Sequence, residues 1–306
     1  MKTRRLAIAL VMTLRQLLRN RVALVLLVVV PIVFQAVTLE TAPRRDVIVE
    51  LASVPEAEMA MAPPTYLSKR HVRPEDRRAV VEEPARNVTL IFVTVATVGV
   101  LAAYVALTLM QRNASSTLRL VLCGYRPWEL LAANVVAFLC VVAALSGVAA
   151  GFLLHVIGGV RPAVMLLGLL LAGWVYGCYG LLVGAALRTE LAGLLCVVLL
   201  SSLDVMWLQN PMDYAEAGAR LLIRSLPGHL PSQVSLVGAF EDYEFGRQAL
   251  GARAYGGALL AMAAVVFAWK GRVRRDPSAP PSPPGRRGEP TFGSPGGGGP
   301  ARSVVP

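Results

Sequence analysis

Few residues in this chain have the types and the spacing that catalysis requires. The lysines are Lys2, Lys69 and Lys270, and none of them follows a glycine in the Walker pattern that cradles phosphate groups. The three histidines lie in separate segments, and no GxSxG nucleophile motif accompanies them. We therefore expect a protein that is not an enzyme, with no cofactor of its own and no P-loop to bind ATP.

The cysteines give no sign of a metal site. All fall in apolar runs or in a short connection between two runs, at Cys123, Cys140, Cys178 and Cys196. Their spacing fits neither a disulfide framework nor a zinc site, so we expect no bound metal.

Asp204 is the one acidic residue that we place inside an apolar run, LLSSLDVMW. A carboxylate within a membrane is costly and is a functional candidate by default. Two other interpretations stay open: the residue lies close enough to a membrane surface to be wetted, or it caps the turn at 209–211. An intramembrane aspartyl protease would need a second, paired carboxylate, which we do not find in the sequence.

Composition places these residues in a membrane protein. Hydrophobic residues make up 55% of the chain, and the mean hydropathy is +0.58. Several apolar runs approach or exceed the ~20 residues that cross ~30 Å of hydrocarbon. The net charge of +11 is divided among short loops, which is typical of membrane topology, so we expect contact with membrane lipids and no nucleic acid.

The apolar runs predict an all-α, polytopic integral membrane protein with six transmembrane helices. A membrane domain over 22–272 contains the spans, and residues 1–21 have the spacing of an amphipathic interfacial helix. A signal peptide is the alternative for that first segment. The six spans are 22–39, 88–110, 128–157, 163–187, 191–208 and 252–269.

Two polar segments separate the spans on the predicted outer side. Residues 40–87 contain one partly alternating stretch, DVIVEL at 46–51, which predicts a short strand; the remainder is typical of loop with some helix. Residues 209–251 contain an apolar stretch, SQVSLVGAF, that is too short to cross a membrane. The tail at 273–306 is rich in proline, glycine and arginine and is predicted to be disordered.

Charge asymmetry orients the six spans. The predicted inner side has 17 cations and 4 acids, a balance of +13, whereas the remaining 13 cations and 15 acids give −2. Positive residues favour the cytoplasmic side, so both termini are predicted to be cytoplasmic.

Glycines recur at helical spacing in two of the spans. Small residues on one face let helices approach closely. Packing within the bundle is the favoured interpretation, and a face for dimerisation is the alternative. The positions are Gly147, Gly151, Gly173, Gly177, Gly180 and Gly184.

The connection at 111–128 is polar and lies on the predicted inner side. Ser115 or Ser116 can cap a short helix, and 124–127 can turn the chain back into the membrane. The sequence therefore predicts a helix across the inner surface. An ordinary loop, with arginines that serve only membrane topology, is the alternative.

Four stretches resemble the permease subunits of type-2 ABC exporters: LRQLLRNR at 14–21, STLRLVLCGYRPWELL at 116–131, GLLVGAALRTELAG at 180–193 and LQNP at 208–211. The second stretch, 116–131, is similar to the family's Gly-Thr-Leu-Glu-x-Leu coupling segment and to the Arg-Trp-Glu sequence with which the family's third span begins. Ser116 stands where the family commonly has Gly, and Arg119 where it has Glu. The resemblance covers roughly residues 5–272.

This resemblance implies separate cytoplasmic ATPase subunits that bind the ATP, a second permease copy or paralogue, and a bacterial plasma membrane location. The largely apolar interior favours an amphipathic or lipid-like cargo, such as a drug, antibiotic, peptide or glycolipid, and Asp204 is a possible residue of the transport pathway. The alternative function is a non-transporting assembly or sensor protein whose outer loops bind a partner. The implied ATPase-coupling residues are Arg112, Thr117, Leu118, Arg119, Leu120, Arg126 and Glu129.

Overall fold

The computed structural model of the chain describes residues 11–12, 15, 21–42, 46–53, 78–112, 127–187, 189–204, 226–240 and 245–273. The elements are α2 (Arg21–Thr41), β1 (Asp46–Ser53), β2 (Arg78–Pro84), α4 (Ala85–Arg112), α6 (Pro127–Ile157), α7 (Pro162–Ala186), α8 (Glu190–Ser202), α10 (His229–Phe240) and α11 (Gly246–Val273).

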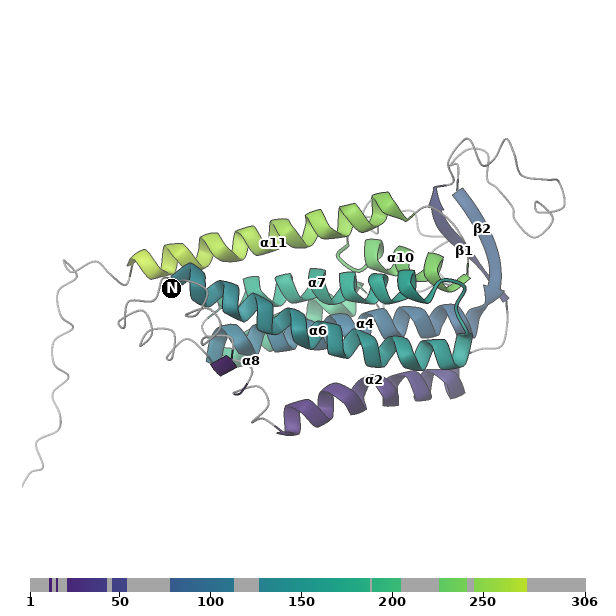
Figure 1. The fold of residues 1–306 in the computed structure, drawn as a ribbon, viewed down its shortest axis with the longest axis horizontal. Coiled ribbons are helices and arrows are strands. Elements are labelled where there is room, and N and C mark those ends of the chain that lie inside the picture. Colours follow the sequence, from purple (N-terminus) through teal and green to yellow (C-terminus); the bar gives the residue numbers. More distant parts are fainter. Residues whose placement is uncertain are drawn as a thin grey trace, which may run out of the picture.

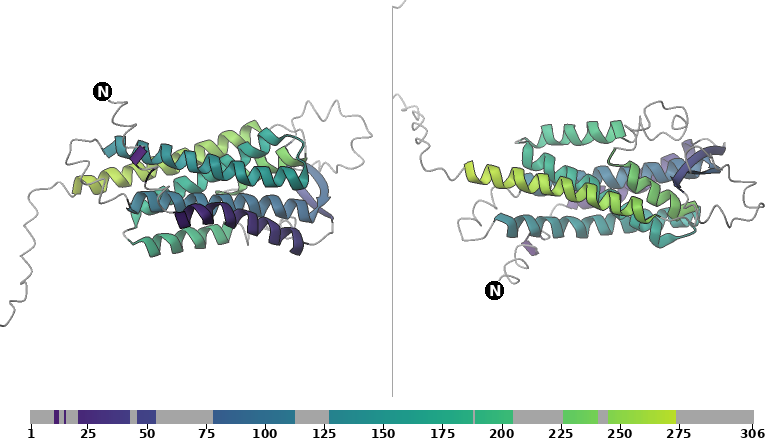
Figure 2. Two further views of the ribbon diagram at one scale, coloured as in Figure 1. Left: turned by 60° about the horizontal axis from the view of Figure 1, so that its bottom comes forward. Right: turned by 90° about the horizontal axis from the view of Figure 1, so that it is seen from above.

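The long helices form one bundle around α4 and α7 (Figure 1). The contact between α4 and α7 is the most extensive in the described chain, and α6, α8, α10 and α11 all pack against α7. Helix α2 lies at the edge, against α4 and α6 (Figure 2). Close packing of these two helices is possible because Gly180 and Gly184 of α7 lie directly against α4.

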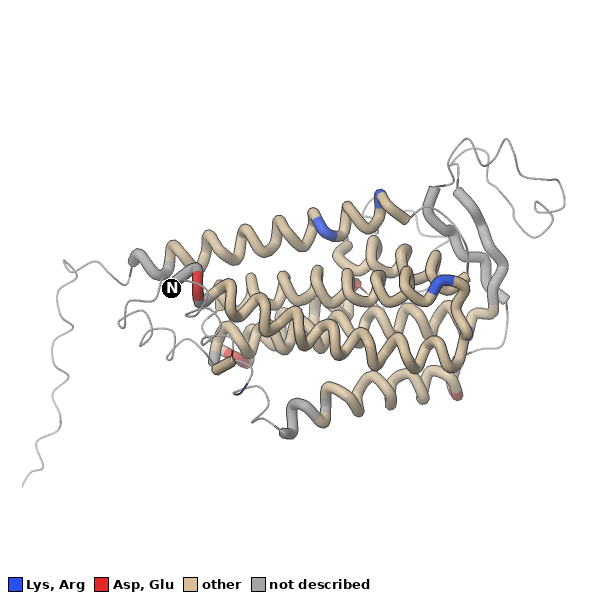
Figure 3. Tube along the Cα trace, viewed as in Figure 1, with Lys and Arg blue, Asp and Glu red and all other residues tan. Residues whose placement is uncertain are grey.

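The predicted spans are confirmed at four places. Among the described residues, four helices are long and apolar enough to cross a membrane: Ala85–Gln111, Leu131–Ile157, Pro162–Ala186 and Gly246–Trp269. The predicted first and fifth spans are also helical, but the apolar stretches described there are shorter, Leu27–Thr41 and Glu190–Ser202. Charged residues are sparse along the described helices and occur mostly toward the ends of the bundle, as Figure 3 shows.

The helices run in alternating directions between two ends of the bundle. One end, here called the sheet end, carries β1 and β2, and there α4, α7 and α11 begin (Figure 1). At the opposite end, here called the connection end, α4 ends and α6 begins (Figure 1). The start of α2 and the end of α11 both lie toward the connection end (Figure 1). That the connection end faces the cytoplasm stays a prediction. The predicted interfacial helix at 1–21 and the tail at 273–306 lie almost entirely outside the described residues.

A small antiparallel sheet accompanies the helical bundle, whose all-α class is confirmed. Strand β1 pairs with β2, with Asp46 opposite Pro84 and Val49 opposite Val81. The strand predicted at 46–51 is confirmed. Its partner, RAVVEEP, falls in a stretch predicted as loop or helix, because its apolar residues are adjacent and give no two-residue alternation. Pairing with β1, a contact invisible in local sequence, supplies its backbone hydrogen bonds.

The glycines of α7 lie against neighbouring helices, whereas those of α6 do not. A Cβ atom added at Gly177 or Gly180 of α7 would collide with the Phe138 ring or with the Ala103 backbone, and Gly173 and Gly184 are similarly close to neighbouring helices. Packing within the bundle is therefore confirmed for α7. The same prediction is wrong for Gly147 and Gly151 of α6, which have nothing within 4 Å of an added Cβ atom.

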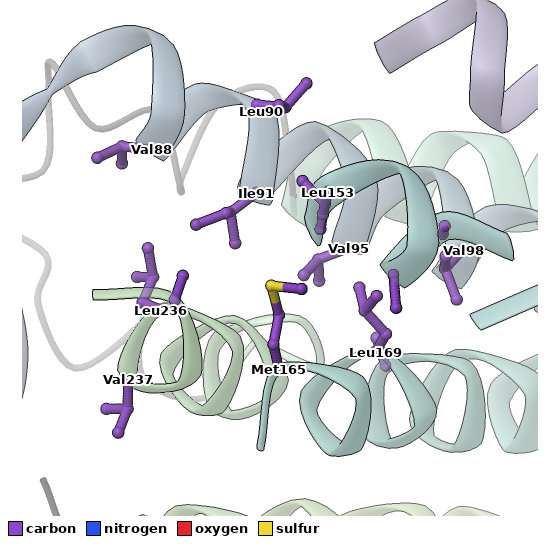
Figure 4. Close-up of a cluster of buried hydrophobic side chains, with 14 of the residues drawn as sticks. Val88, Leu90, Ile91, Val95, Val98, Leu153, Met165, Leu169, Leu236 and Val237 are labelled. Carbon is purple, nitrogen blue, oxygen red and sulfur yellow. The ribbon is translucent and has the colours of Figure 1, made fainter. Parts of the chain in front are cut away.

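The largest cluster of buried side chains joins four helices at the sheet end. Figure 4 shows residues of this cluster from α4 (Val88, Leu90, Ile91, Val95, Val98), α6 (Leu153), α7 (Met165, Leu169) and α10 (Leu236, Val237). The short helix α10 is therefore part of the core of the bundle.

Replacing Gly180 by alanine should loosen the packing of α4 on α7. The new methyl group meets backbone atoms of Ala103, which cannot move aside as a side chain can, so we expect a loss of about 1–3 kcal/mol of stability. Gly147→Ala is the matched control, because open space surrounds that position and alanine favours a helix. Thermal unfolding in detergent should show a lower Tm for Gly180→Ala alone; equal Tm values would contradict the packing described here.

Candidate functional site

Helix α10 is a short helix enclosed by long ones. Its 12 residues span about 18 Å at 1.5 Å per residue, which is too short for a hydrocarbon layer of ~30 Å. The prediction that this stretch does not cross is therefore confirmed. Residues 231–239 are all buried, and α10 packs against α4, α7 and α11. Helix α10 thus fills the sheet end of the bundle from within.

The C-terminal end of α10 is held by the turn between α6 and α7. The Arg161 amide donates to the Gly238 carbonyl at 2.8 Å, and the Val160 amide donates to the Ala239 carbonyl at 3.1 Å. The last carbonyls of a helix lack partners within the helix, so these two amides satisfy groups that would otherwise be buried unbonded. The Arg161 guanidinium also lies 5.8 Å from the centre of the Phe245 ring, just before α11.

The middle of α10 makes close backbone contact with α7. A Cβ atom added at Gly168 would overlap Ser235, and one added at Gly238 would overlap the backbone of Met165. These two glycines let α10 and α7 approach more closely than larger side chains would allow.

The N-terminal end of α10 is bonded to Asp204. The Gly228 amide donates to Oδ2 of Asp204 at 2.7 Å, and the Tyr176 hydroxyl donates to the same oxygen. Asp204 is 0% exposed. A carboxylate at a helix N-terminus is favoured both by free amides and by the helix dipole, and bonds to an ionised oxygen are stronger than neutral ones. One side chain thus connects α7, the end of α8 and the start of α10.

Tyr176 is positioned by the space that Gly99 leaves in α4, here called the notch. Its side chain is fully buried, and its ring lies against Gly99, where any Cβ atom would collide with it. A buried tyrosine hydroxyl needs a polar partner, which Asp204 provides. The hydroxyl therefore fixes the carboxylate relative to both central helices.

Sequence reasoning singled out Asp204 and missed Tyr176 and Gly228. Of the interpretations left open, the buried position does not match a wetted carboxylate. Capping does occur, at the start of α10, whereas the turn at 209–211 lies outside the described residues. A tyrosine within an apolar span was the available signal for Tyr176, because its hydroxyl requires a partner.

Most of the predicted coupling residues cannot be placed. Thr117, Leu118, Arg119, Leu120 and Arg126 lie outside the described residues, as does the predicted surface helix. The two remaining residues belong to the helices that flank this segment: Arg112 is the last residue of α4, and Glu129 is buried in the first turn of α6.

The connection end also links α4 to α8. Gln111 donates through Nε2 to the carbonyl of Thr189, at 3.3 Å, and Gly193 of α8 packs against Leu107. A displacement of the end of α4 would therefore act directly on the start of α8.

Within the described ranges, no group of three His, Cys, Asp or Glu side chains is arranged to hold a metal ion.

Comparison with protein families matches residues 60–268 to the family described as ABC-2 family transporter protein. The match spans more than half of the 306 residues and includes α4, α6, α7, α8, α10 and the connection at 113–126. A comparison with curated proteins found no match.

Removal of the Asp204 carboxylate should destabilise the bundle. Asp204→Ala leaves the Tyr176 hydroxyl and the Gly228 amide without this acceptor, at a cost of about 1–3 kcal/mol for each group. Asp204→Asn keeps an acceptor oxygen and should lose less stability than Asp204→Ala. Ser202→Ala, at an exposed position of α8, is the control and should be neutral. Thermal unfolding in detergent checks the ranking, and an unchanged Tm for Asp204→Ala would contradict the bonding described here.

Proposed function

The chain belongs to the ABC-2 family of transporter proteins, and we propose that it is the permease subunit of an exporter driven by separate cytoplasmic ATPase subunits. The family match over 60–268 is the observation that carries this proposal. Four described helices are long and apolar enough to cross a membrane, as a permease requires. ATP would be bound by the partner subunits, because the sequence contains no Walker pattern.

The connection at 113–126 is the proposed docking segment for the ATPase. It joins α4, which ends at Arg112, to α6, which begins at Pro127. A cytoplasmic position for this end is supported by the 17 cations and 4 acids of the predicted inner side. The family resemblance assigns the contact itself to residues 117–120, with Arg112, Arg126 and Glu129 beside them.

Helix α4 is the proposed lever between the ATPase and the sheet end. It runs the length of the bundle and packs against α2, α6, α7, α8 and α10. A push on its end at Arg112 would be transmitted along a rigid helix to all of these neighbours. Transport by such a device requires two discrete arrangements of packed helices.

The proposed cargo is an amphipathic or lipid-like molecule, such as a drug, antibiotic, peptide or glycolipid, that moves outward. Support comes from the apolar helices and from the described core, in which buried apolar side chains outnumber buried polar ones. Asp204, at the junction of α7, α8 and α10, is the proposed residue of the transport pathway. The functional complex would contain a second permease copy or paralogue in a bacterial plasma membrane. The family match favours this function over a non-transporting assembly or sensor protein.

Disruption of the docking segment should release the ATPase. Leu118→Asp or Arg119→Glu changes the proposed contact, so the ATPase that co-purifies with the unaltered chain from its native membrane should be lost. Arg302→Glu, a charge reversal in the tail, is the control and should retain it. Retained ATPase binding and transport in both variants of the docking segment would count against the assignment.

Replacement of the Asp204 carboxyl by an amide should reduce export. Asp204→Asn keeps the size of the side chain, so its effect reports on the carboxylate and its hydrogen bonds rather than on packing volume. Export of the cargo from cells, normalised to the amount of protein in the membrane, provides the measurement. Unchanged export at normal expression would show that Asp204 has no place in the pathway.

A further inference from the structure

Helix α10 has three polar side chains, near its start, within its buried stretch 231–239. Ser232, Gln233 and Ser235 are 1%, 7% and 0% exposed, although they pack among apolar side chains of α4, α7 and α11. Polar groups lose hydration when they are buried, and they regain it when water reaches them. Contact with water therefore costs less at these three side chains than at the apolar side chains around them.

The two ends of α10 are held in different ways. The C-terminal carbonyls are bonded to backbone amides of the turn between α6 and α7. At the N-terminal end the Gly228 amide donates to a side-chain oxygen, Oδ2 of Asp204, and the His229 amide donates to the Leu226 carbonyl of the preceding turn. A side chain can change its partner without unfolding the backbone, so the N-terminal end is the one that can be released.

The bond at the N-terminal end depends on how α4 and α7 fit together. Oδ2 of Asp204 also accepts from the Tyr176 hydroxyl, and the Tyr176 ring occupies the notch at Gly99 of α4. Gly99 lies 13 residues before the end of α4 at Arg112, which is about 20 Å along the helix axis. Tyr176 belongs to α7, so a shift of α4 against α7 would press α4 on the Tyr176 ring and displace its hydroxyl relative to Asp204.

We propose that Asp204, Tyr176 and Gly228 form a latch that keeps α10 seated in the sheet end of the bundle. Movement of α4 opens the latch, the N-terminal end of α10 leaves its place, and a path for cargo opens at the sheet end. Tyr176 is a positioning residue, because it acts through Asp204. The ATP-driven part of this inference rests on the proposed function, whereas the latch itself does not.

Accessibility of α10 tests the latch on the chain alone. Ser232→Cys, in a chain whose four native cysteines are replaced by serine, places a thiol of similar size near the start of α10. Labelling by a charged maleimide is followed in membrane fragments that are open to both sides, so the result does not depend on orientation. Tyr176→Phe keeps the ring in its notch and removes only the hydroxyl, and one lost hydrogen bond should accelerate labelling about fivefold.

Two controls separate release of α10 from other effects. Tyr179→Phe removes a hydroxyl three residues away that donates to the Cys196 carbonyl rather than to Asp204, so it should leave the labelling rate unchanged. Ser146→Cys places the thiol at a fully buried position of α6 and should stay unlabelled unless the whole bundle unfolds. Equal labelling of Ser232→Cys with and without Tyr176→Phe would overturn the latch.

The ATP-driven step is tested on the complex purified with its ATPase. Addition of ATP and Mg²⁺ should accelerate the labelling of Ser232→Cys in the chain that retains Tyr176, and Tyr176→Phe should reduce this dependence on ATP. Labelling that responds to Tyr176→Phe but not to ATP would overturn ATP-driven release while the latch stands. Failure of any ATPase to co-purify would instead overturn the proposed function.

Discussion

A helix that ends inside an apolar bundle must find partners for its terminal backbone groups within the protein itself. Helix α10 meets this requirement at both ends: backbone amides of the turn at 158–161 bond its last carbonyls, and Asp204 bonds the Gly228 amide before its first turn. The rest of the arrangement follows from these bonds. Asp204 must lie at the end of α8, Tyr176 must reach it from α7, and Gly99 must leave room for the ring.

Helix α4 links the connection end of the molecule to the hydrogen bonds of Asp204. The connection between α4 and α6 is where an ATPase would act, and α10 is where cargo would leave. Helix α4 joins these places, since its last turn contacts the start of α8 through Gln111 and its middle holds the ring of Tyr176. A membrane protein without a P-loop therefore has a direct structural route by which work done at one end can change hydrogen bonds toward the other.

Sequence patterns predicted the parts of this structure that depend on local composition. Long apolar runs predicted the helices, and the cost of a carboxylate in such a run directed attention to Asp204. Its partners were missed because Tyr176 and Gly228 lie 28 and 24 residues away in sequence, and helical periodicity carries no information about which helices pack together. Strand β2 was missed for a similar reason, because its order comes from pairing with β1. Glycine spacing found the packed face of α7 but could not show that Gly147 and Gly151 face outward from the bundle.

ATP binding to a partner subunit should move α10 within this chain. Spin labels on Ser232→Cys of α10 and His155→Cys at the exposed end of α6 would report that movement as a distance, in the purified complex of permease and ATPase. We expect a second, longer distance that appears with ATP and Mg²⁺ and disappears when the nucleotide is removed. A single distance that is the same with and without ATP would contradict the proposed movement of α10.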